Sequence, residues 1–464
     1  MANKTETAGY ARTLDAARSE TVFEDFKEPY NKGQAVAEAN RCLFCTDAPC
    51  IKACPTSIDI PQFIRKIATD NIRGSAKTIF DSNIHGMSCA RVCPVEVLCV
   101  GDCVYNEMDM PPIQIGKLQR YATDAAYAAG MQFYEAAAPT GKKVAIVGGG
   151  PASLACAHML RRHGHACTVF EKHRVLGGLN TTGVAPYKMR ADKSLEEAAW
   201  ILSIGGIEIR SGVTVGTDVS WADLERDFDA VFVGLGLGAD SRLGVPGEDL
   251  GSIYGAVDFI ERMKLGQMNV RSVKHAVVVG GGNTAIDAVR ELVGLGIPSV
   301  SMLYRGVREQ MSGYEHEFEA GVSEGVKGVW QTQPVAFEGA SSSGRGDVQR
   351  IRAVKLDDKK KPIAGSDHVI DADLVLLAIG QAKLGELLGG LDGIKLDKGR
   401  IVVDADGFTG RAKYWAGGDC ANGGKEVVNA SAEGKRAANA IHTALTGASK
   451  NAGGAATNVG GARA

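Results

Sequence analysis

Short runs of consecutive apolar residues, each leading directly into three glycines, occur twice along the chain, at 144–147 and within 275–279. A continuous apolar run of this length is typical of a parallel strand that is buried on both faces. Each glycine cluster is followed by a segment with helical character and then by a further apolar run, at 167–170 and 299–304. The pattern therefore predicts two strand–turn–helix–strand units.

Three other apolar runs, at 230–234, 374–380 and 414–419, predict further strands, and a helix is expected from about 427 to 445. We expect the chain to leave the first unit near Gly244 and to return to it near Asp371. The predicted fold class is α/β, with a mainly helical N-terminal domain followed by two Rossmann-like nucleotide-binding domains, the second inserted in the first. The predicted domains are 1–138; 139–244 together with 371–446; and 245–370, with a disordered tail at 447–464.

The N-terminal domain is predicted to be helical because apolar positions between 58 and 80 follow helical spacing, and a further helix is expected at 116–129. Residues 1 to about 40 are predicted to form an arm that packs on the following segment through Phe23, Phe26 and Tyr30. From 322 to 370, short apolar stretches broken by Gly-Ala-Ser-Ser-Ser-Gly and Asp-Asp-Lys-Lys-Lys predict strands and exposed turns.

Composition narrows the class of protein without identifying it. The 464 residues are 45% hydrophobic and 23% charged, with a formal net charge of −2. This balance gives no reason to expect nucleic acid or an anionic membrane as a partner. No apolar run is long enough to span a bilayer and the N-terminus lacks a signal-peptide pattern, so a cytoplasmic protein is expected.

Eight of the eleven cysteines fall between residues 42 and 103. They are spaced as Cys42-x2-Cys45-x4-Cys50-x3-Cys54-Pro, followed by Cys89-x3-Cys93-Pro-x5-Cys99-x3-Cys103. Thiolates at this density are typical ligands of iron–sulfur clusters, and four ligands for each cluster imply two clusters with interleaved ligands. Zinc is the competing interpretation, but neither a second Cys-x2-Cys nor a His pair follows at finger spacing. Disulfides are disfavoured because nothing marks the chain for an oxidising compartment.

The first glycine cluster carries the features of a dinucleotide site. Its glycines allow a tight turn and a close approach to a pyrophosphate at a helix N-terminus, and Glu171 ends the next strand where a carboxylate binds the adenosine ribose. Ser153 occupies the place of the usual third glycine and is small enough for close packing. These features suit FAD, whereas a glycine-rich turn without a ligand is the alternative.

The second glycine cluster differs at the end of its second strand, where Arg305 replaces the acid and Arg308 follows. Arginines would attract the 2′-phosphate of NADP, although they could also be solvated surface residues. The sequence therefore favours NADPH at this site, and NADH remains open.

With these motifs, the chain resembles the glutamate synthase small-subunit superfamily over nearly its whole length. The segments 42–50, 54–60 and 112–119 resemble dihydropyrimidine dehydrogenase in particular, within its amino-terminal cluster and flavin domains. That enzyme's pyrimidine-reducing barrel has no counterpart here. The closest resemblance is to the separate flavin and iron–sulfur subunit of the bacterial two-subunit enzyme.

The resemblance implies two 4Fe–4S clusters and names their ligands. The first set is Cys42, Cys45, Cys50 and Cys103; the second is Cys54, Cys93, Cys99 and Gln119. A count of cysteines alone would instead enlist Cys89 for the second cluster. Whether Cys89 or Gln119 is the ligand is left to experiment.

The same resemblance implies the nucleotide-binding residues. For FAD they are Gly148, Gly149, Gly150, Pro151, Ala152, Ser153, Glu171, Lys172, Gly178, Leu179, Val215, Gly418 and Asp419, with Lys188 where the family has arginine. For NAD(P)H they are Gly281, Gly282, Asn283, Thr284, Arg305, Arg308, Ala378, Ile379 and Gly380. Gly306 replaces a second basic residue of the family, which weakens the preference for NADPH.

The implied function is electron entry for dihydropyrimidine dehydrogenase, from NAD(P)H through FAD and the clusters to an FMN-containing barrel subunit, in a hetero-oligomer that analogy suggests is a heterotetramer. The alternatives are a glutamate synthase small subunit and a ferredoxin-linked NAD(P)H oxidoreductase without a pyrimidine partner. No catalytic acid or base is required in this chain, and none is predicted. Cys156, Cys167 and Cys420 are isolated and are therefore predicted to be packing residues. The nucleotide domains contain no Cys-x-x-Cys pair, which excludes a disulfide reductase.

Overall fold

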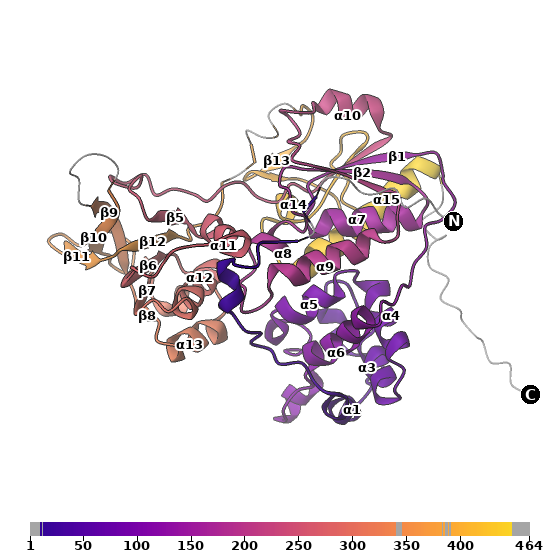
Figure 1. Ribbon diagram of the computed structural model, residues 1–464, viewed down its shortest axis with the longest axis horizontal. Coiled ribbons are helices and arrows are strands. Elements are labelled where there is room, and N and C mark those ends of the chain that lie inside the picture. The colour runs from indigo at the N-terminus through magenta and orange to yellow at the C-terminus, as the bar shows by residue number, and fades with distance from the viewer. Residues whose placement is uncertain are drawn as a thin grey trace, which may run out of the picture.

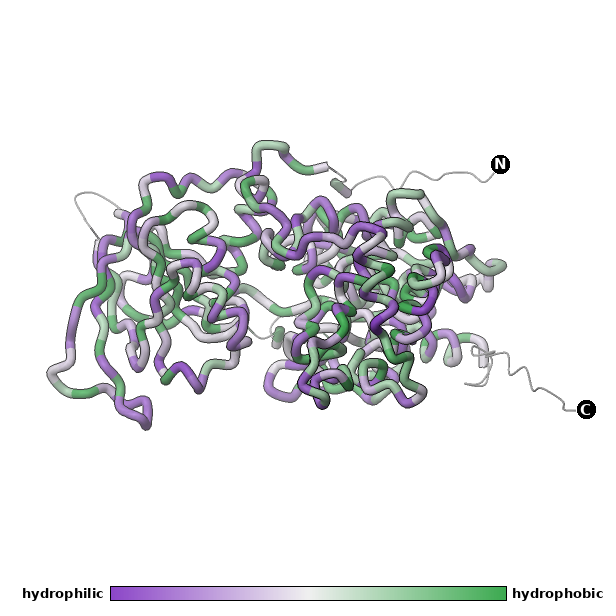
Figure 2. The backbone as a smooth tube through the Cα atoms, turned by 90° about the horizontal axis from the view of Figure 1, so that it is seen from below, coloured by the Kyte–Doolittle hydropathy of each residue, from purple (hydrophilic) through white to green (hydrophobic). Residues whose placement is uncertain are grey.

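The computed structural model describes residues 10–11, 13–339, 346–382, 384–385, 388 and 391–447, which form a helical domain and two domains built on parallel sheets (Figure 1). The tube view in Figure 2 shows the second sheet domain as a separate lobe, joined to the rest by a narrow waist. The helical domain contains α1 (Lys32–Asn40), α2 (Pro49–Ala53), α3 (Ile60–Ala68), α4 (Ile72–Ser82), α5 (Gly86–Val92), η2 (Val95–Val97), η3 (Val104–Met108) and α6 (Ile115–Ala128). The helical prediction for this part is confirmed.

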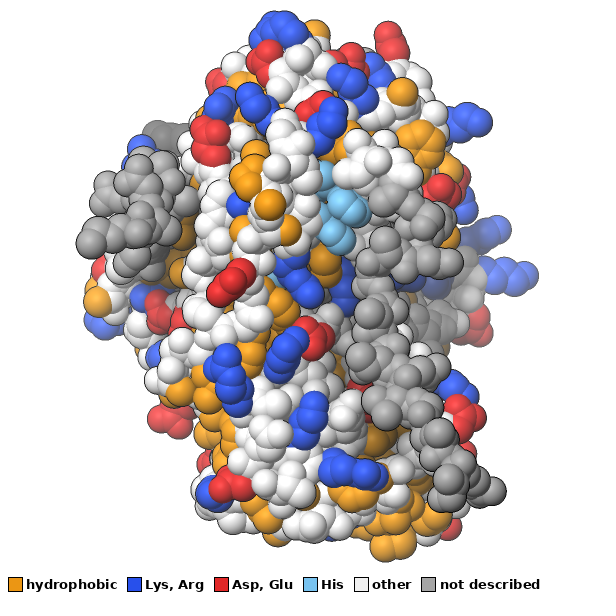
Figure 3. All heavy atoms as spheres, turned by 90° about the vertical axis from the view of Figure 1, so that its right-hand side faces the viewer, with side chains coloured by type: hydrophobic (Ala, Val, Ile, Leu, Met, Phe, Trp, Pro, Cys, Tyr) orange, Lys and Arg blue, Asp and Glu red, His pale blue; other side chains and the backbone are white. Residues whose placement is uncertain are grey.

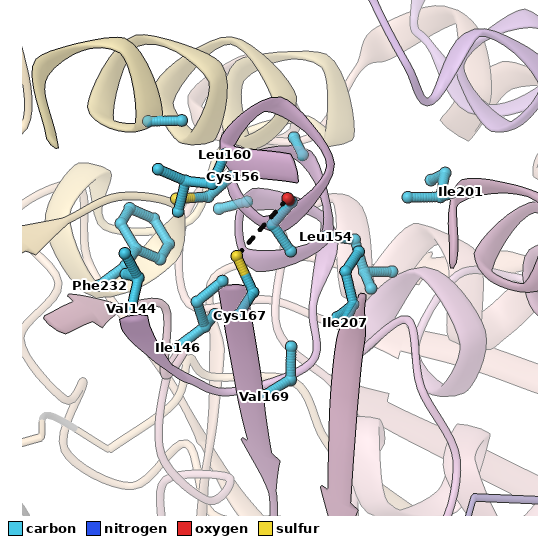
Figure 4. Close-up of a cluster of buried hydrophobic side chains, with 14 of the residues drawn as sticks. Val144, Ile146, Leu154, Cys156, Leu160, Cys167, Val169, Ile201, Ile207 and Phe232 are labelled. Atoms are coloured by element: carbon cyan, nitrogen blue, oxygen red, sulfur yellow. Dashed lines mark hydrogen bonds between the residues drawn. The ribbon is translucent and has the colours of Figure 1, made fainter. Parts of the chain in front are cut away.

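The first sheet has the order β15-β4-β1-β2-β3, and all of its neighbours are parallel. Its strands are β1 (Lys143–Val147), β2 (Ala166–Glu171), β3 (Ile207–Ser211), β4 (Ala230–Val233) and β15 (Tyr414–Ala416). Helix α7 (Pro151–Arg162) covers one face, and Figure 4 shows Val144, Ile146 and Val169 from the strands meeting Leu154 and Leu160 of this helix. These side chains are fully or almost fully buried, as continuous apolar strands require.

Helix α15 (Val427–Thr446) packs beside α7 at unusually short range. A Cβ atom at Gly434 would lie 2.0 Å from the carbonyl oxygen of Ala152. Only glycine allows this contact, so the predicted C-terminal helix is held directly against the helix that follows the first glycine turn.

The second sheet has the order β5-β12-β6-β7-β8 and is also parallel. Its strands are β5 (Ile253–Gly255), β6 (His275–Val279), β7 (Ser299–Leu303), β8 (Lys327–Val329) and β12 (Leu374–Leu377), and its helices are α11 (Ala256–Leu265), α12 (Asn283–Gly294) and α13 (Glu315–Ser323). A three-stranded antiparallel sheet of β9 (Thr332–Gly339), β10 (Val348–Lys355) and β11 (His368–Asp371) adjoins it. The strands predicted between 322 and 370 are thus present, although α13 includes the first two residues of that range; residues 340–345 lie outside the described part.

The prediction that the chain returns to the first domain near Asp371 is wrong, because the next strand, β12, belongs to the second sheet. Strand β12 pairs with β5 and β6 of the second sheet, and the chain re-enters the first sheet only at β15. The sequence of an apolar strand that is buried on both faces does not indicate the sheet to which the strand belongs, because its pairing depends on tertiary contacts.

The N-terminal arm crosses all three domains. Phe23 is buried against Tyr187 and Ile260 of the two sheet domains, whereas Tyr30 packs on the core of the helical domain. The Ser19 N–H donates to the Gly266 carbonyl at 2.9 Å, and a buried Arg18–Glu20 ion pair (2.7 Å) reinforces the segment. The arm packs as predicted, but much of its contact is with the sheet domains, not with the next segment.

At the other end of the chain, the disorder predicted for 447–464 falls outside the described residues except at Gly447. No helix within the described ranges has the length and apolar character needed to cross a membrane.

Three histidines pack together where α7 ends beside the last turns of α15, and histidine side chains (pale blue) gather at one place on this side of the molecule (Figure 3). The His163 and His442 rings stack with centroids 4.0 Å apart, and His165 Nε2 lies 2.9 Å from His442 Nδ1. Burial, followed by repulsion from the other imidazoles, lowers the pKa of His165 to about 4. His165 is therefore neutral near pH 7.

Acidification is expected to destabilise this group. Because the pKa of His165 is lower in the folded chain, its stabilising contribution is complete above about pH 6.5 and is lost as the pH falls toward 4. The free energy of unfolding should fall by at most about 1.4 kcal/mol per pH unit from this residue, and His165→Asn should show a shallower dependence. Chemical denaturation at several pH values measures both slopes. Equal slopes would contradict the assignment, and His275→Asn, at an exposed position, serves as control.

Candidate functional site

Four thiols of the helical domain surround one apolar pocket. Cys42 and Cys45 lie on a turn with Phe44 in the left-handed region (φ 52°), Cys50 lies on α2, and Cys103 precedes η3. The remaining wall is apolar and includes Ala48, Ile60, Ile64, Ile113 and Ile115. The structure thus brings together the four cysteines of the predicted first set.

The chemistry of this pocket fits a cluster. Burial raises the pKa of Cys42, and burial together with the neighbouring thiols raises that of Cys50 to about 12. One of the four thiols is buried and three are partly buried. Such thiols become favourable ligands once positively charged iron compensates their ionisation. Among the described residues, no three Cys, His, Asp or Glu side chains converge as ligands of a single metal ion do, and the thiols instead enclose a shared pocket.

A second set of thiols lies deeper in the helical domain. Burial raises the pKa of Cys99, and the charges of the Cys93 and Cys54 thiolates raise it further. These three thiols are therefore neighbours. A hydrogen bond with Cys89, followed by burial, raises the pKa of Cys93. Gln119 is also buried here, and its Nε2 donates to the Gly86 carbonyl at 2.7 Å. Both candidates for the fourth ligand therefore belong to this region.

The fourth ligand can be tested by paired variants. We expect Cys89→Ser to retain both clusters and Gln119→Leu to disturb the second one, because the resemblance assigns Gln119 as ligand. Iron quantitation and low-temperature EPR of the two purified variants measure this. Loss of a cluster from Cys89→Ser with Gln119→Leu unaffected would reverse the assignment.

A cleft of about 1030 Å³ lies between the two sheet domains and the helical domain. It is large enough for an extended dinucleotide. The predicted residues that line it are Gly148, Gly149, Gly150, Pro151, Ala152, Glu171, Lys172, Gly178, Leu179, Lys188, Asn283, Thr284, Ala378, Gly380, Gly418 and Asp419. The predicted residues that do not line it are Ser153, Val215, Gly281, Gly282, Arg305, Arg308 and Ile379.

The first glycine turn has the geometry of a pyrophosphate site. Gly148 has φ 97°, and a Cβ atom there would lie 2.3 Å from the Gly234 carbonyl oxygen, so the turn requires glycine. Glu171 at the end of β2 accepts the Gly149 N–H (2.6 Å) and the His173 N–H (2.8 Å), and its oxygens retain lone pairs for a ribose. Ser153 is buried beneath the turn, as a substitute for the third glycine should be.

Asn180 is a cleft residue that the sequence did not reveal. It lines the cleft directly after Gly178 and Leu179, and its buried Oδ1 has no hydrogen-bond partner among the described residues. A buried acceptor without a partner is costly. The amide of this cleft residue is therefore incompletely satisfied by the described part of the chain.

The walls of the cleft are tied together by polar bridges between the two sheet domains. Lys188 contacts Asp287 on α12 (2.9 Å) and Glu317 on α13 (2.8 Å). Burial would lower the pKa of Lys188, but the two carboxylates outweigh it and the pKa is raised. The Tyr314 hydroxyl donates to Glu426 (2.8 Å), the N-cap residue of α15. No sequence motif pointed to these partners, and Lys188 is already paired in this arrangement.

Asp419 lies at the same end of the cleft, after β15. Burial raises its pKa to about 6, and repulsion from Glu433 and Glu426 adds to the effect. The Gly418 N–H donates to Glu433 at 2.7 Å. The predicted Gly-Asp pair is thus fixed next to the N-terminus of α15.

The two arginines after β7 differ. Arg308 is held by Glu315 (Nε to Oε1, 2.8 Å) and Glu319, whereas Arg305 is exposed and has no hydrogen-bond or ion-pair partner within the described ranges. Only Arg305 is therefore uncommitted, and this leaves one arginine where the sequence suggested two.

Replacing Arg305 tests the cofactor preference. If Arg305 binds a 2′-phosphate, Arg305→Ala should raise the KM for NADPH by about 10- to 100-fold, the value of a charge-assisted hydrogen bond, with little change for NADH. Steady-state reduction of an artificial acceptor with each cofactor measures this. Arg350→Ala, an exposed arginine paired with Glu338, is the control; unchanged KM values for both cofactors in Arg305→Ala would exclude the assignment.

Comparison with known proteins agrees with this geometry. Residues 18–131 match the family model for dihydropyrimidine dehydrogenase domain II, 4Fe-4S cluster, and residues 142–434 match that for pyridine nucleotide-disulphide oxidoreductase. The chain is 34% identical to the glutamate synthase (NADPH) small chain of Escherichia coli (strain K12), over 90% of this chain and 93% of the relative. The chain belongs to the glutamate synthase small-subunit superfamily. It is equally 34% identical to the NAD-dependent dihydropyrimidine dehydrogenase subunit PreT of the same organism, over 89% of this chain and 95% of that subunit.

Among solved structures, thioredoxin reductase of T. acidophilum has the same fold in its sheet domains, with a TM-score of 0.52 and 20% identity over 66% of this chain and 99% of that one. The expected fold class and family resemblance are confirmed. The chain is an NAD(P)H-dependent flavin and iron–sulfur oxidoreductase.

Proposed function

We propose that this chain is the electron-entry subunit of a dihydropyrimidine dehydrogenase. It would accept electrons from NAD(P)H and pass them through FAD and two 4Fe–4S clusters to an FMN-containing partner that reduces uracil or thymine to the 5,6-dihydro form. The flavin, when bound, converts the two electrons of a hydride into single-electron steps.

The observation that carries this proposal is the position of Cys93. Val92 and Pro94, its two chain neighbours, both line the cleft that holds the glycine turns. The same thiol is adjacent to Cys89 and Cys99 in the helical domain. A proposed cluster ligand therefore lies between two wall residues of the proposed flavin site, and electron transfer needs such a short separation.

The chain's own residues also support the entry of electrons in this cleft. Lys188 and Glu426 from the first sheet domain meet Asp287, Glu317 and Tyr314 from the second. These contacts hold Asn283 and Thr284, at the second glycine turn, on the same cleft as the first turn. A nicotinamide cofactor whose pyrophosphate is bound at the second turn would thus share the cleft with a flavin cofactor bound at the first.

The site residues follow from this proposal. Cys42, Cys45, Cys50 and Cys103 would hold the first cluster, and Cys54, Cys93, Cys99 and Gln119 the second. FAD would occupy the first glycine turn with Glu171, and NAD(P)H the second, with NADPH favoured by Arg305.

Glutamate synthase small subunit is the second candidate, because the similarity to that relative is as high. The two functions differ in the partner and share the electron path within this chain. The Asp47–Cys50 segment and the Ile58–Ile60 segment resemble dihydropyrimidine dehydrogenase and favour the first.

The deciding experiment measures uracil-dependent and thymine-dependent oxidation of NAD(P)H by the purified chain, with and without an FMN-containing barrel subunit. We expect activity only with both. Glutamate formation with a large amidotransferase subunit, and none with the barrel, would select the second candidate. Pyrimidine reduction by this chain alone would contradict the proposal that the partner subunit carries out that step.

A further inference from the structure

The helix that leads to Cys93 is held by a residue of another domain. Helix α5 is buried along nearly its whole length, and its N-cap residue His85 makes no side-chain hydrogen bond to the first turn. Instead, Glu197 on α9 (Ala191–Leu202) of the first sheet domain accepts the N–H groups of Met87 and Ser88, each at 3.0 Å. In Figure 1, α5 lies directly below α8 (Leu179–Thr182) and α9.

The contact between Glu197 and the first turn of α5 is buried, and further contacts hold the two helices together. Glu197 is 1% exposed, and its second oxygen accepts the Ser88 hydroxyl. Nearby, Trp200 on the same helix packs against Phe80 of α4, with ring centroids 4.6 Å apart and the ring planes tilted by 37°. Helix α9 is therefore fixed on the helical domain by packing, and Glu197 aims its carboxylate at the start of α5.

Ser88, which contacts Glu197, is also hydrogen-bonded to the cleft residue Asn180. Asn180 donates from Nδ2 to the Ser88 hydroxyl at 2.8 Å and to the Ser194 hydroxyl at 3.1 Å. Asn180 itself lines the cleft, and its Oδ1 is the buried acceptor without a partner. A chain of side chains thus runs from the cleft through Asn180 and Ser88 to Glu197, and through α5 to Cys93.

We propose that Glu197 is a positioning residue that holds α5, and with it Cys93, in register with the flavin cleft for electron transfer to the second cluster. The inference rests on the proposed function of the cleft and of the second set of thiols. Only the four residues 89–92 of α5 separate Ser88, the last residue that contacts Glu197, from Cys93, so a shift at the first turn moves the thiol by a similar amount. The carboxylate also lies near enough to the helix to influence the electrostatic potential at its far end.

The test uses the anaerobically purified chain with its own flavin and clusters, without any partner subunit. Glu197→Gln retains the shape of the side chain and removes its charge. At about pH 8 we expect the midpoint potential of the second cluster to shift to a more positive value, because removal of a nearby negative charge favours reduction, while the first cluster does not change. Transfer from reduced flavin to cluster should slow by about tenfold in stopped-flow experiments, since misplacement of less than 1 Å has effects of this order, whereas the KM for NAD(P)H should not change.

The neighbouring Glu196→Gln is the matched control, because Glu196 is on the same helix, exposed and paired with Lys193. If Glu197→Gln does not fold, Ser88→Ala breaks the chain of side chains while leaving the two backbone contacts, and it should slow the same step. Three outcomes would each overturn the proposal. The midpoint potentials of both clusters could shift equally, the potentials and rates of Glu197→Gln could equal those of Glu196→Gln, or the parent chain could contain no second cluster. Because every readout is internal to this chain, a failure with the barrel subunit would count against the proposed function alone.

Discussion

Replacing Cys93 by Ala is expected to stop electron transfer out of this chain while leaving reduction of its flavin by NAD(P)H intact. The thiol lies between two cleft residues, Val92 and Pro94, and belongs to the second set of cysteines. A cluster that loses one of its thiolate ligands is labile, so about half of the iron and acid-labile sulfide should be absent. Flavin bleaching on addition of NAD(P)H should remain, because the glycine turns are untouched.

Iron and sulfide analysis, EPR and stopped-flow absorbance of the flavin provide the measurements. Cys156→Ala is the control, since Cys156 is a fully buried packing residue on α7 whose pKa burial raises. It should cost stability but keep its full iron content. A Cys93→Ala protein that retains both clusters and reduces a one-electron acceptor at the parent rate would remove Cys93 from the path.

Replacing Glu171 by Gln is expected to weaken FAD binding by about 10- to 100-fold. A carboxylate that accepts ribose hydroxyls contributes about 1.5–3 kcal/mol through charge-assisted hydrogen bonds, and the amide forfeits most of this. The turn itself should survive, because the amide oxygen can still accept the Gly149 N–H that Glu171 now holds at 2.6 Å. The dissociation constant comes from titration of the flavin-free protein with FAD, followed by flavin fluorescence.

Glu208→Gln is a suitable control, because Glu208 on β3 is half exposed and pairs with Arg210 outside the cleft. An unchanged FAD dissociation constant in Glu171→Gln would mean that this carboxylate only braces the turn. In that case the ribose would have to be bound by other residues of the cleft, such as Lys172.

Much of the local structure could be predicted because it depends on neighbouring residues. The runs at 144–147 and 275–279 became β1 and β6, and the helix expected near residue 427 begins there. The four cysteines of the first set do share a pocket. Close spacing along the chain brings Cys42, Cys45 and Cys50 together with little help from the rest of the fold.

Contacts between distant segments were the ones that prediction missed. Lys188 was expected at the flavin, yet it pairs with Asp287 and Glu317 of the other sheet domain. Arg305 and Arg308 were treated alike, and only the position of α13 shows that Glu315 and Glu319 engage Arg308. Glu197 and Asn180 belong to no sequence motif, and their roles depend on the packing of α5 against the first sheet domain.

The order of residues along this chain determined its strands, its glycine turns and the grouping of its thiols, because each arises from backbone preferences and spacings within a few residues. The tertiary structure alone decided that β12 joins the second sheet, that the arm spans three domains, and that the two neighbours of Cys93 line the cleft. These features depend on which buried surfaces meet after folding. Apolar strands and helices of similar composition can satisfy that requirement in several ways, and only packing of the whole chain selects one.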